Sequence, residues 1–91
     1  MRKEVFYIDN DTIFKGTILD EEQKFASVSY KTYVKIHFPC LVDQNSGKVM
    51  DSIQQFFKIW VFVEDIFVTF SDAKDELTKR KSTTIVENVF N

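Results

Sequence analysis

The sequence predicts a mainly β protein, folded as a small, strongly bent five-stranded barrel with one C-terminal helix. Five short segments have the composition or the alternation of strands, polar turn residues separate them, and a glycine interrupts the second segment. Helical spacing of apolar residues follows the last strand. With 91 residues the chain has room for one hydrophobic core, so a single domain is expected.

The first two strands are expected over residues 3–9 and 12–20, joined as a hairpin. Between them lies the turn Asp-Asn-Asp (9–11), whose side chains favour turns by bonding to nearby backbone. Gly16 lies inside the second strand, where a missing side chain usually marks a bulge or the close approach of another backbone. A polar loop is expected at 20–24.

The third strand is expected over residues 29–38, because apolar and polar side chains alternate along it. Proline cannot donate a backbone hydrogen bond to a ladder, so Pro39 is expected to end this strand. After a loop, a long apolar segment from about 49 to 63 predicts the fourth strand. Its inner face would carry Ile59 and Val61.

The chain is then expected to turn at 63–65, to form a short fifth strand over 66–68 and to enter a helix near Thr69. Thr69 and Asp72 match a capping box, in which the threonine oxygen accepts a backbone N–H of the first helical turn. The basic run at 79–81 suits the negative end of that helix.

The helix is expected to be a lid, because only Phe70, Ala73 and Leu77 fall on one apolar stripe. The barrel with its helix is therefore assigned to residues 1–81, and residues 82–91 form a C-terminal tail. The apolar spacing of this tail fits a short amphipathic helix, and an added edge strand is the alternative.

Composition is that of a folded soluble protein, with 44% apolar and 29% charged residues. The net charge of -2 lacks the basic excess of a domain that wraps nucleic acid. A single cysteine and a single histidine exclude a disulfide within the chain and a Cys/His zinc cluster within one monomer. The N-terminus does not resemble a secretory signal, and the longest apolar stretch is too short to cross a bilayer. We therefore expect a cytoplasmic protein with no membrane partner.

The segments EVFYIDNDTIFKGTILD and IFVTFSDAKDEL resemble a group of small, mostly uncharacterised proteins of low-GC Gram-positive bacteria, their phages and plasmids. The resemblance implies an SH3-like barrel and no particular activity, since such barrels serve many unrelated roles. The middle of the chain, from about 25 to 55, has no counterpart in the pattern. Phe70 stands where the pattern is usually polar, and Ser71 replaces an acid. The matching positions are Val5, Phe6, Ile13, Gly16, Ile18, Ile66, Phe67, Thr69, Asp72, Ala73 and Leu77.

Three aromatic residues of the fourth strand, Phe56, Trp60 and Phe62, would face away from its inner apolar row. A barrel interior cannot take both sets, so the terminal helix, the tail or a partner must cover the second one. Phe70 adds another aromatic ring. These four residues are the candidate surface for a protein partner or for self-association, because monomers rarely expose large contiguous apolar areas.

The alternative site is the outer face of the third strand, formed by Lys31, Tyr33, Lys35 and His37. Alternating cations and rings allow phosphates to meet positive charge while bases stack on aromatic side chains. Residues 23–50 are also locally basic. A solvated strand face would explain the same alternation without any ligand.

Other arrangements have simpler structural explanations. Ser71 lies at a strand-to-helix junction, where nucleophiles occur, but the cap accounts for that junction. His37 and Cys40 have the outline of a thiol dyad without an orienting third group. The acidic loops at 9–11 and 20–22 match no calcium-binding spacing. We therefore expect no catalytic residue, no metal site and no cofactor.

The sequence thus predicts a non-catalytic macromolecule-binding module, with a protein partner as the leading interpretation. Binding of nucleic acid is the alternative, an enzyme is the third hypothesis, and a homo-oligomer is compatible with the first. By analogy with phage and plasmid proteins, the expected role is that of an adaptor, a regulator or an inhibitor of a host complex.

Overall fold

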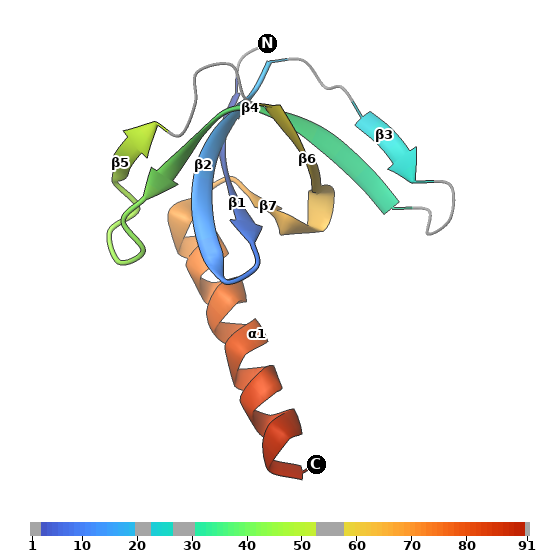
Figure 1. Ribbon diagram of the computed structural model, residues 1–91, viewed down its shortest axis with the longest axis vertical. Coiled ribbons are helices and arrows are strands. Elements are labelled where there is room, and N and C mark those ends of the chain that lie inside the picture. The colour runs from blue at the N-terminus through green and yellow to red at the C-terminus, as the bar shows by residue number, and fades with distance from the viewer. Residues whose placement is uncertain (1–2, 20–22, 27–30, 53–57, 91) are drawn as a thin grey trace.

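A computed structural model describes residues 3–19, 23–26, 31–52 and 58–90 of the protein. These residues form one curled antiparallel sheet, a half-barrel, and one long C-terminal helix (Figure 1). The expected mainly β, barrel-like fold with a single terminal helix is confirmed. The elements are β1 (Lys3–Asp9), β2 (Thr12–Ile18), β3 (Gln23–Ala26), β4 (Lys31–Val42), β5 (Val49–Ser52), β6 (Lys58–Phe62), the 3-10 helix η1 (Val63–Asp65), β7 (Ile66–Phe67) and α1 (Phe70–Phe90).

The described part of the chain contains seven strands, where five were expected. Strand β3 lies in the segment expected to begin as a polar loop, and β5 and β6 both lie within the expected fourth strand. The difference arises because short segments beside a long strand gain ladder hydrogen bonds whatever their own composition.

Strand β4 organises the sheet. Along one edge it pairs with β3 and then with β2, and along the other edge with β6 and then with β5. Strand β1 lies between β2 and β7, so the path through the sheet runs β3-β4-β2-β1-β7. Figure 1 shows β4 as the long strand that bends across the top of the molecule.

The hairpin of β1 and β2 is confirmed. The two strands pair along their whole length, from Lys3 opposite Ile18 to Asp9 opposite Thr12. Two residues therefore make the turn, and Asn10 has the positive φ of 57° that such turns require.

Pro39 does not end β4, which corrects the expectation. Between the pairs Lys15–Cys40 and Thr17–His37, β4 has one residue more than β2, so β4 carries a bulge there. Phe38 lies in the bulge with a φ of 55°, in the left-handed region. A proline is tolerated at a bulge because its missing N–H is not needed in the ladder, and the strand continues to Val42.

Gly16 lies opposite this bulge and explains the bend. A Cβ placed on Gly16 would collide with the side chain of Ile36 and would lie 3.4 Å from the carbonyl oxygen of His37. The two backbones therefore approach as closely as they do only because the side chain is missing. The close approach predicted at Gly16 is confirmed, and the bulge lies in the partner strand β4.

Two hydrophobic clusters lie on the two faces of the sheet. The helix-side cluster lies between the sheet and α1, and the inner cluster lies on the opposite face of the sheet. Strand β1 contributes to both, because its successive side chains point to opposite faces. The inner cluster consists of Val5, Tyr7, Val34, Ile36 and Val61, and the helix-side cluster of Ile8, Ile13, Val42, Ala73 and Leu77.

The predicted start of α1 is confirmed, since the backbone N–H of Asp72 donates to Oγ1 of Thr69 at 3.1 Å. Ala73 and Leu77 are buried against the sheet. The helix does not end at the basic run 79–81, because no glycine or proline interrupts it. The backbone of residues 82–90 continues the helix, which projects away from the sheet in Figure 1.

Within the described part of the chain, no helix combines the length and the apolar character that a bilayer span requires.

Candidate functional site

The two sets of candidate residues meet on one surface. In the ladder between β4 and β6, Tyr33 lies opposite Phe62, Lys35 opposite Trp60, and His37 opposite Lys58. Residues paired across antiparallel strands point to the same face, so the basic stripe and the aromatic row become neighbours. We call this surface the aromatic–cationic face; it consists of Tyr33, Lys35, His37, Lys58, Trp60 and Phe62.

The opposite face of the same strands explains why these side chains point outward. Val34, Ile36 and Val61 are buried in the inner cluster, and Ile59 packs against it. Because the side-chain period of a strand is two, the residues between them must point away from the core. The alternation predicted for both strands is therefore confirmed over 33–37 and 59–62.

Contacts between neighbouring side chains hold the aromatic rings of this face in place. The rings of Tyr33 and Phe62 lie 4.2 Å apart between centroids and are tilted by 35°. The ammonium of Lys35 lies 5.3 Å from the centre of the Trp60 ring, in the geometry of a cation–π contact. Trp60 nevertheless remains 45% exposed. A large ring held in place at the surface can bury further area on binding at little cost in conformational entropy.

Two candidate residues lie wholly or partly outside the described part of the chain. Phe56 lies outside the described residues. Lys31 begins β4, where its backbone pairs with Ala26, and its side chain lies outside what the structure describes.

Phe70 does not extend the aromatic–cationic face, which corrects the grouping made from sequence. Its ring lies 5.9 Å from that of Phe6, edge to face, within the helix-side cluster. A Cβ on Gly47 would lie 2.5 Å from Cγ of Phe70, so the ring also rests on the glycine of the β4–β5 loop. Phe70 therefore closes the joint between the helix and the sheet.

That loop is tied to the rest of the fold by Gln44. Its side chain accepts a hydrogen bond from the backbone nitrogen of Ile13 and donates one to the carbonyl oxygen of the same residue, both at 2.9 Å. Lys74 of α1 donates to the carbonyl oxygen of Gln44 at 2.6 Å. Asp43 accepts backbone hydrogen bonds from Asn45 and Ser46, which lower the pKa of its carboxyl group.

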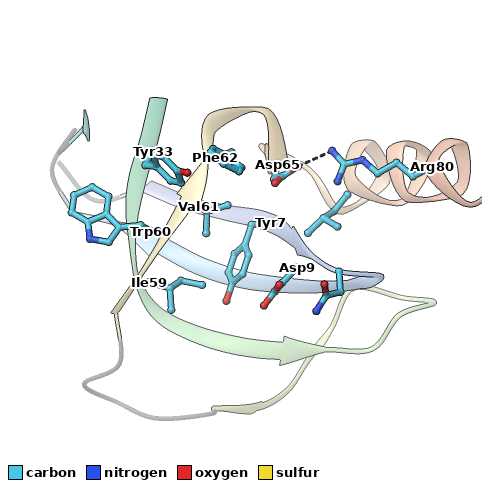
Figure 2. Close-up of a pocket in the computed structure, with 11 residues that line it drawn as sticks. Tyr7, Asp9, Tyr33, Ile59, Trp60, Val61, Phe62, Asp65 and Arg80 are labelled. Atoms are coloured by element: carbon cyan, nitrogen blue, oxygen red, sulfur yellow. Dashed lines mark hydrogen bonds and ion pairs between the residues drawn. The ribbon is translucent and has the colours of Figure 1, made fainter. Parts of the chain in front are cut away.

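A cavity of about 470 Å³ opens between the end of β1 and β6 (Figure 2). Ile59 and Val61 form part of its apolar wall, and Tyr7, Asp9 and Asp65 bring polar groups to it. Sequence reasoning did not find this cavity, because its residues come from four separate segments and their spacing has no motif. The described residues that line it are Tyr7, Ile8, Asp9, Asn10, Tyr33, Ile59, Trp60, Val61, Phe62, Asp65 and Arg80.

Tyr7 is the most buried polar side chain of this cavity, at 2% exposure. Its ring stacks on Phe14, with centroids 5.4 Å apart and an interplanar angle of 16°. Burial raises the pKa of its hydroxyl, and the nearby Asp9 and then Cys40 add to the shift. The hydroxyl is therefore protonated throughout the physiological range and can donate a hydrogen bond.

An ion pair borders the cavity on the helix side. Nη2 of Arg80 lies 2.7 Å from Oδ1 of Asp65, and Nε of the same side chain lies 3.3 Å from Oε1 of Glu76. The pair joins α1 to η1, as the dashed line in Figure 2 shows. It holds the helix at a second point after Leu77.

The catalytic and metal hypotheses gain no geometric support in the described residues. Ser71 is exposed in the first turn of α1. The thiol of Cys40 donates to the carbonyl oxygen of Phe38, and no hydrogen bond joins it to His37 among the residues described. In the same part of the chain, no three His, Cys, Asp or Glu side chains form a group suited to a metal ion. Residues 20–22, the second acidic loop, lie outside the described residues.

Comparison of the chain with protein-family models, with curated proteins and with solved structures gives no match.

Proposed function

We propose that the protein is a non-catalytic binding module whose aromatic–cationic face docks an acidic segment of a protein partner. One observation carries this proposal: the register of β4 and β6 joins an exposed tryptophan, two further rings and two lysines on one face. Aromatic side chains with cations beside them are typical of the energetic centres of protein interfaces.

The chemistry of the face selects the partner. Lys35 and Lys58 lie on it, and none of its six residues is acidic. A partner with carboxylate groups would therefore gain charge complementarity, which mainly increases the association rate and the specificity. The rings of Trp60 and Phe62 would supply apolar contact area.

Binding of single-stranded nucleic acid is the second candidate, supported by the contact of Lys35 with Trp60. The same cations would meet phosphates, and the rings would stack on bases. The net charge of -2 favours the protein partner, because affinity for nucleic acid depends on neutralising many phosphates. In either case we propose a cytoplasmic accessory protein, acting as an adaptor, a regulator or an inhibitor.

Trp60 is the only tryptophan of the chain, so its fluorescence reports directly on the proposed face. The protein is titrated with an extended Glu- and Leu-containing peptide, with the same peptide carrying Gln in place of Glu, and with oligo-dT. We expect saturable quenching by the acidic peptide and at least about tenfold weaker binding of the Gln peptide.

Matched variants test the face itself. Lys35→Glu should weaken binding by about tenfold or more, whereas Lys81→Glu, the same charge change on the exposed surface of α1, should leave it unchanged. Saturable binding of oligo-dT that falls steeply with salt, without peptide binding, would replace the proposal by the nucleic-acid alternative. Equal binding by both lysine variants would contradict either use of this face.

A second copy of the chain is the remaining occupant. Light scattering of the native protein and of Trp60→Ala tests it. A native dimer that becomes monomeric in the variant would mean that the face serves self-association instead of an acidic partner.

A further inference from the structure

We propose that the cavity between the end of β1 and β6 is a separate binding site, for an ammonium or guanidinium group carried on an apolar stem. The cavity shares Tyr33, Trp60 and Phe62 with the aromatic–cationic face. The inference does not depend on the proposed function, because the two polar groups that carry it, those of Tyr7 and Asp9, lie outside that face. Three observations carry it: an unpartnered buried hydroxyl, an unpaired carboxylate beside it, and an apolar wall of suitable length.

The hydroxyl belongs to Tyr7. Its side chain is 2% exposed and makes no hydrogen bond within the described part of the chain. In that same part, no side-chain oxygen that is wholly shut off from solvent lacks a partner. The small exposed area of Tyr7 therefore includes its oxygen, which reaches the cavity. A hydroxyl that faces the cavity and has no hydrogen-bond partner among the described residues can donate to or accept from a ligand bound there.

The carboxylate belongs to Asp9, at the end of β1. Figure 2 shows it beside the hydroxyl of Tyr7, and the two groups interact electrostatically. Asp9 forms no ion pair with any described residue, whereas the other acid of the lining, Asp65, is paired with Arg80. Glu76 provides Arg80 with a second carboxylate. Among the described lining residues, the charge left uncompensated is therefore negative, and it favours a cation beside Asp9.

The stem of the ligand has an apolar surface to lie on. Ile59 and Val61 line the cavity from β6. The volume of about 470 Å³ is within the range of small-ligand sites. A group of the size of a lysine or arginine side chain could place its cation between Asp9 and Tyr7 while its methylene groups contact Ile59 and Val61. Tyr7 would then accept from the cation, and Asp9 would neutralise it.

A cation on an apolar stem could belong to a side chain of a polypeptide or to a free amine. The probes are blocked lysine (N-acetyl-lysine methylamide), its neutral counterpart N-acetyl-norleucine methylamide, and pentylamine. The readout is the NMR shift of the methyl groups of Ile59 and Val61 and of the Tyr7 ring. We expect saturable shifts with blocked lysine and at least about tenfold weaker binding of the neutral counterpart.

Two variants in the β1–β2 hairpin distinguish binding at the cavity from a nonspecific effect of net charge. Asp9→Asn should weaken binding of blocked lysine by about tenfold, and Asp11→Asn, the same change two residues along in the exposed turn, should leave it unchanged. Tyr7→Phe should weaken it by about threefold to tenfold. If Tyr7→Phe does not fold, the two aspartate variants still test the proposal. Both aspartates are exposed, so their substitution should not disturb the fold.

The outcomes are distinct. Binding of pentylamine as tight as that of blocked lysine supports a site for free amines, and binding of blocked lysine only supports a site for a polypeptide side chain. Equal shifts with the neutral counterpart, no saturable shift with either cation, or unchanged binding by Asp9→Asn would overturn the proposal.

Discussion

Strands β1 and β6 have the same apolar character on both faces but different surroundings. In β1, Val5 and Tyr7 belong to the inner cluster, and Ile8 to the helix-side cluster. In β6, Val61 belongs to the inner cluster, whereas Trp60 on the other face remains 45% exposed. Within the described part of the chain, both faces of β1 pack in hydrophobic clusters, whereas the side of β6 that carries Trp60 stays partly exposed.

The reach of the terminal helix causes this difference. Helix α1 packs on the sheet through Ala73 and Leu77, against Ile8, Ile13 and Val42. Further along it touches η1 through Arg80 and then projects away from the sheet (Figure 1). A helix covers a face only where its apolar stripe lies, and this stripe is short. The described contacts of α1 therefore do not reach the outer face of β6, although both faces of β6 are as apolar in sequence as those of β1.

Weakening the packing of α1 against β1 should lower the free energy of unfolding most. Leu77→Ala would leave a cavity between α1 and the sheet, because the side chain is 5% exposed within the helix-side cluster. We expect the free energy of unfolding to fall by about 2–5 kcal/mol, measured by urea denaturation followed by circular dichroism. Lys81→Ala, at an exposed position of the same helix, is the control and should change it by less than about 0.5 kcal/mol.

A loss below about 1 kcal/mol for Leu77→Ala would mean that the helix contributes little to the core. Packing against α1 would then stabilise β1 no more than the exposed Trp60 side stabilises β6.

Removing the N-terminal cap of α1 should lower the free energy of unfolding less than Leu77→Ala does. Thr69→Ala removes the oxygen that accepts the backbone N–H of Asp72, so the free energy of unfolding should fall by about 0.5–2 kcal/mol. Ser71→Ala is the matched control, because that hydroxyl forms no hydrogen bond with any described residue, and it should change stability by less than about 0.5 kcal/mol. Equal losses in the two variants would show that the cap does not stabilise the helix.

Local patterns predicted the elements that depend on local chemistry. The hairpin at Asn10, the close approach at Gly16 and the cap at Thr69 each follow from what one residue can do with its own backbone. The prediction that β4 ends at Pro39 was wrong because it considered local chemistry alone. A proline ends a regular strand, but the bulge that tolerates Pro39 depends on the pairing with β2, which the local sequence does not encode.

The candidate surface was predicted in pieces. Alternation placed Tyr33 and Lys35 on one outer face, and Trp60 and Phe62 on another, because each strand was considered by itself. Only the register of β4 and β6 makes them one surface. The helical stripe correctly placed Phe70 with Ala73 and Leu77, but its grouping with Trp60 and Phe62 was wrong. That grouping and the cavity beside Tyr7 both depend on contacts between segments distant in sequence.

Truncating the uncovered side of β6 should have the smallest effect on stability. Trp60→Ala removes a ring that is 45% exposed and contacts Lys35, so the loss should stay below about 1 kcal/mol in the urea titration used for Leu77→Ala. Tryptophan is the largest side chain, and its removal from a core would cost about 3–5 kcal/mol. The small loss expected here would mean that the ring contributes little to the fold and is available for binding. A loss as large as that of Leu77→Ala would instead make Trp60 part of the core, and β6 would then be covered on both faces as β1 is.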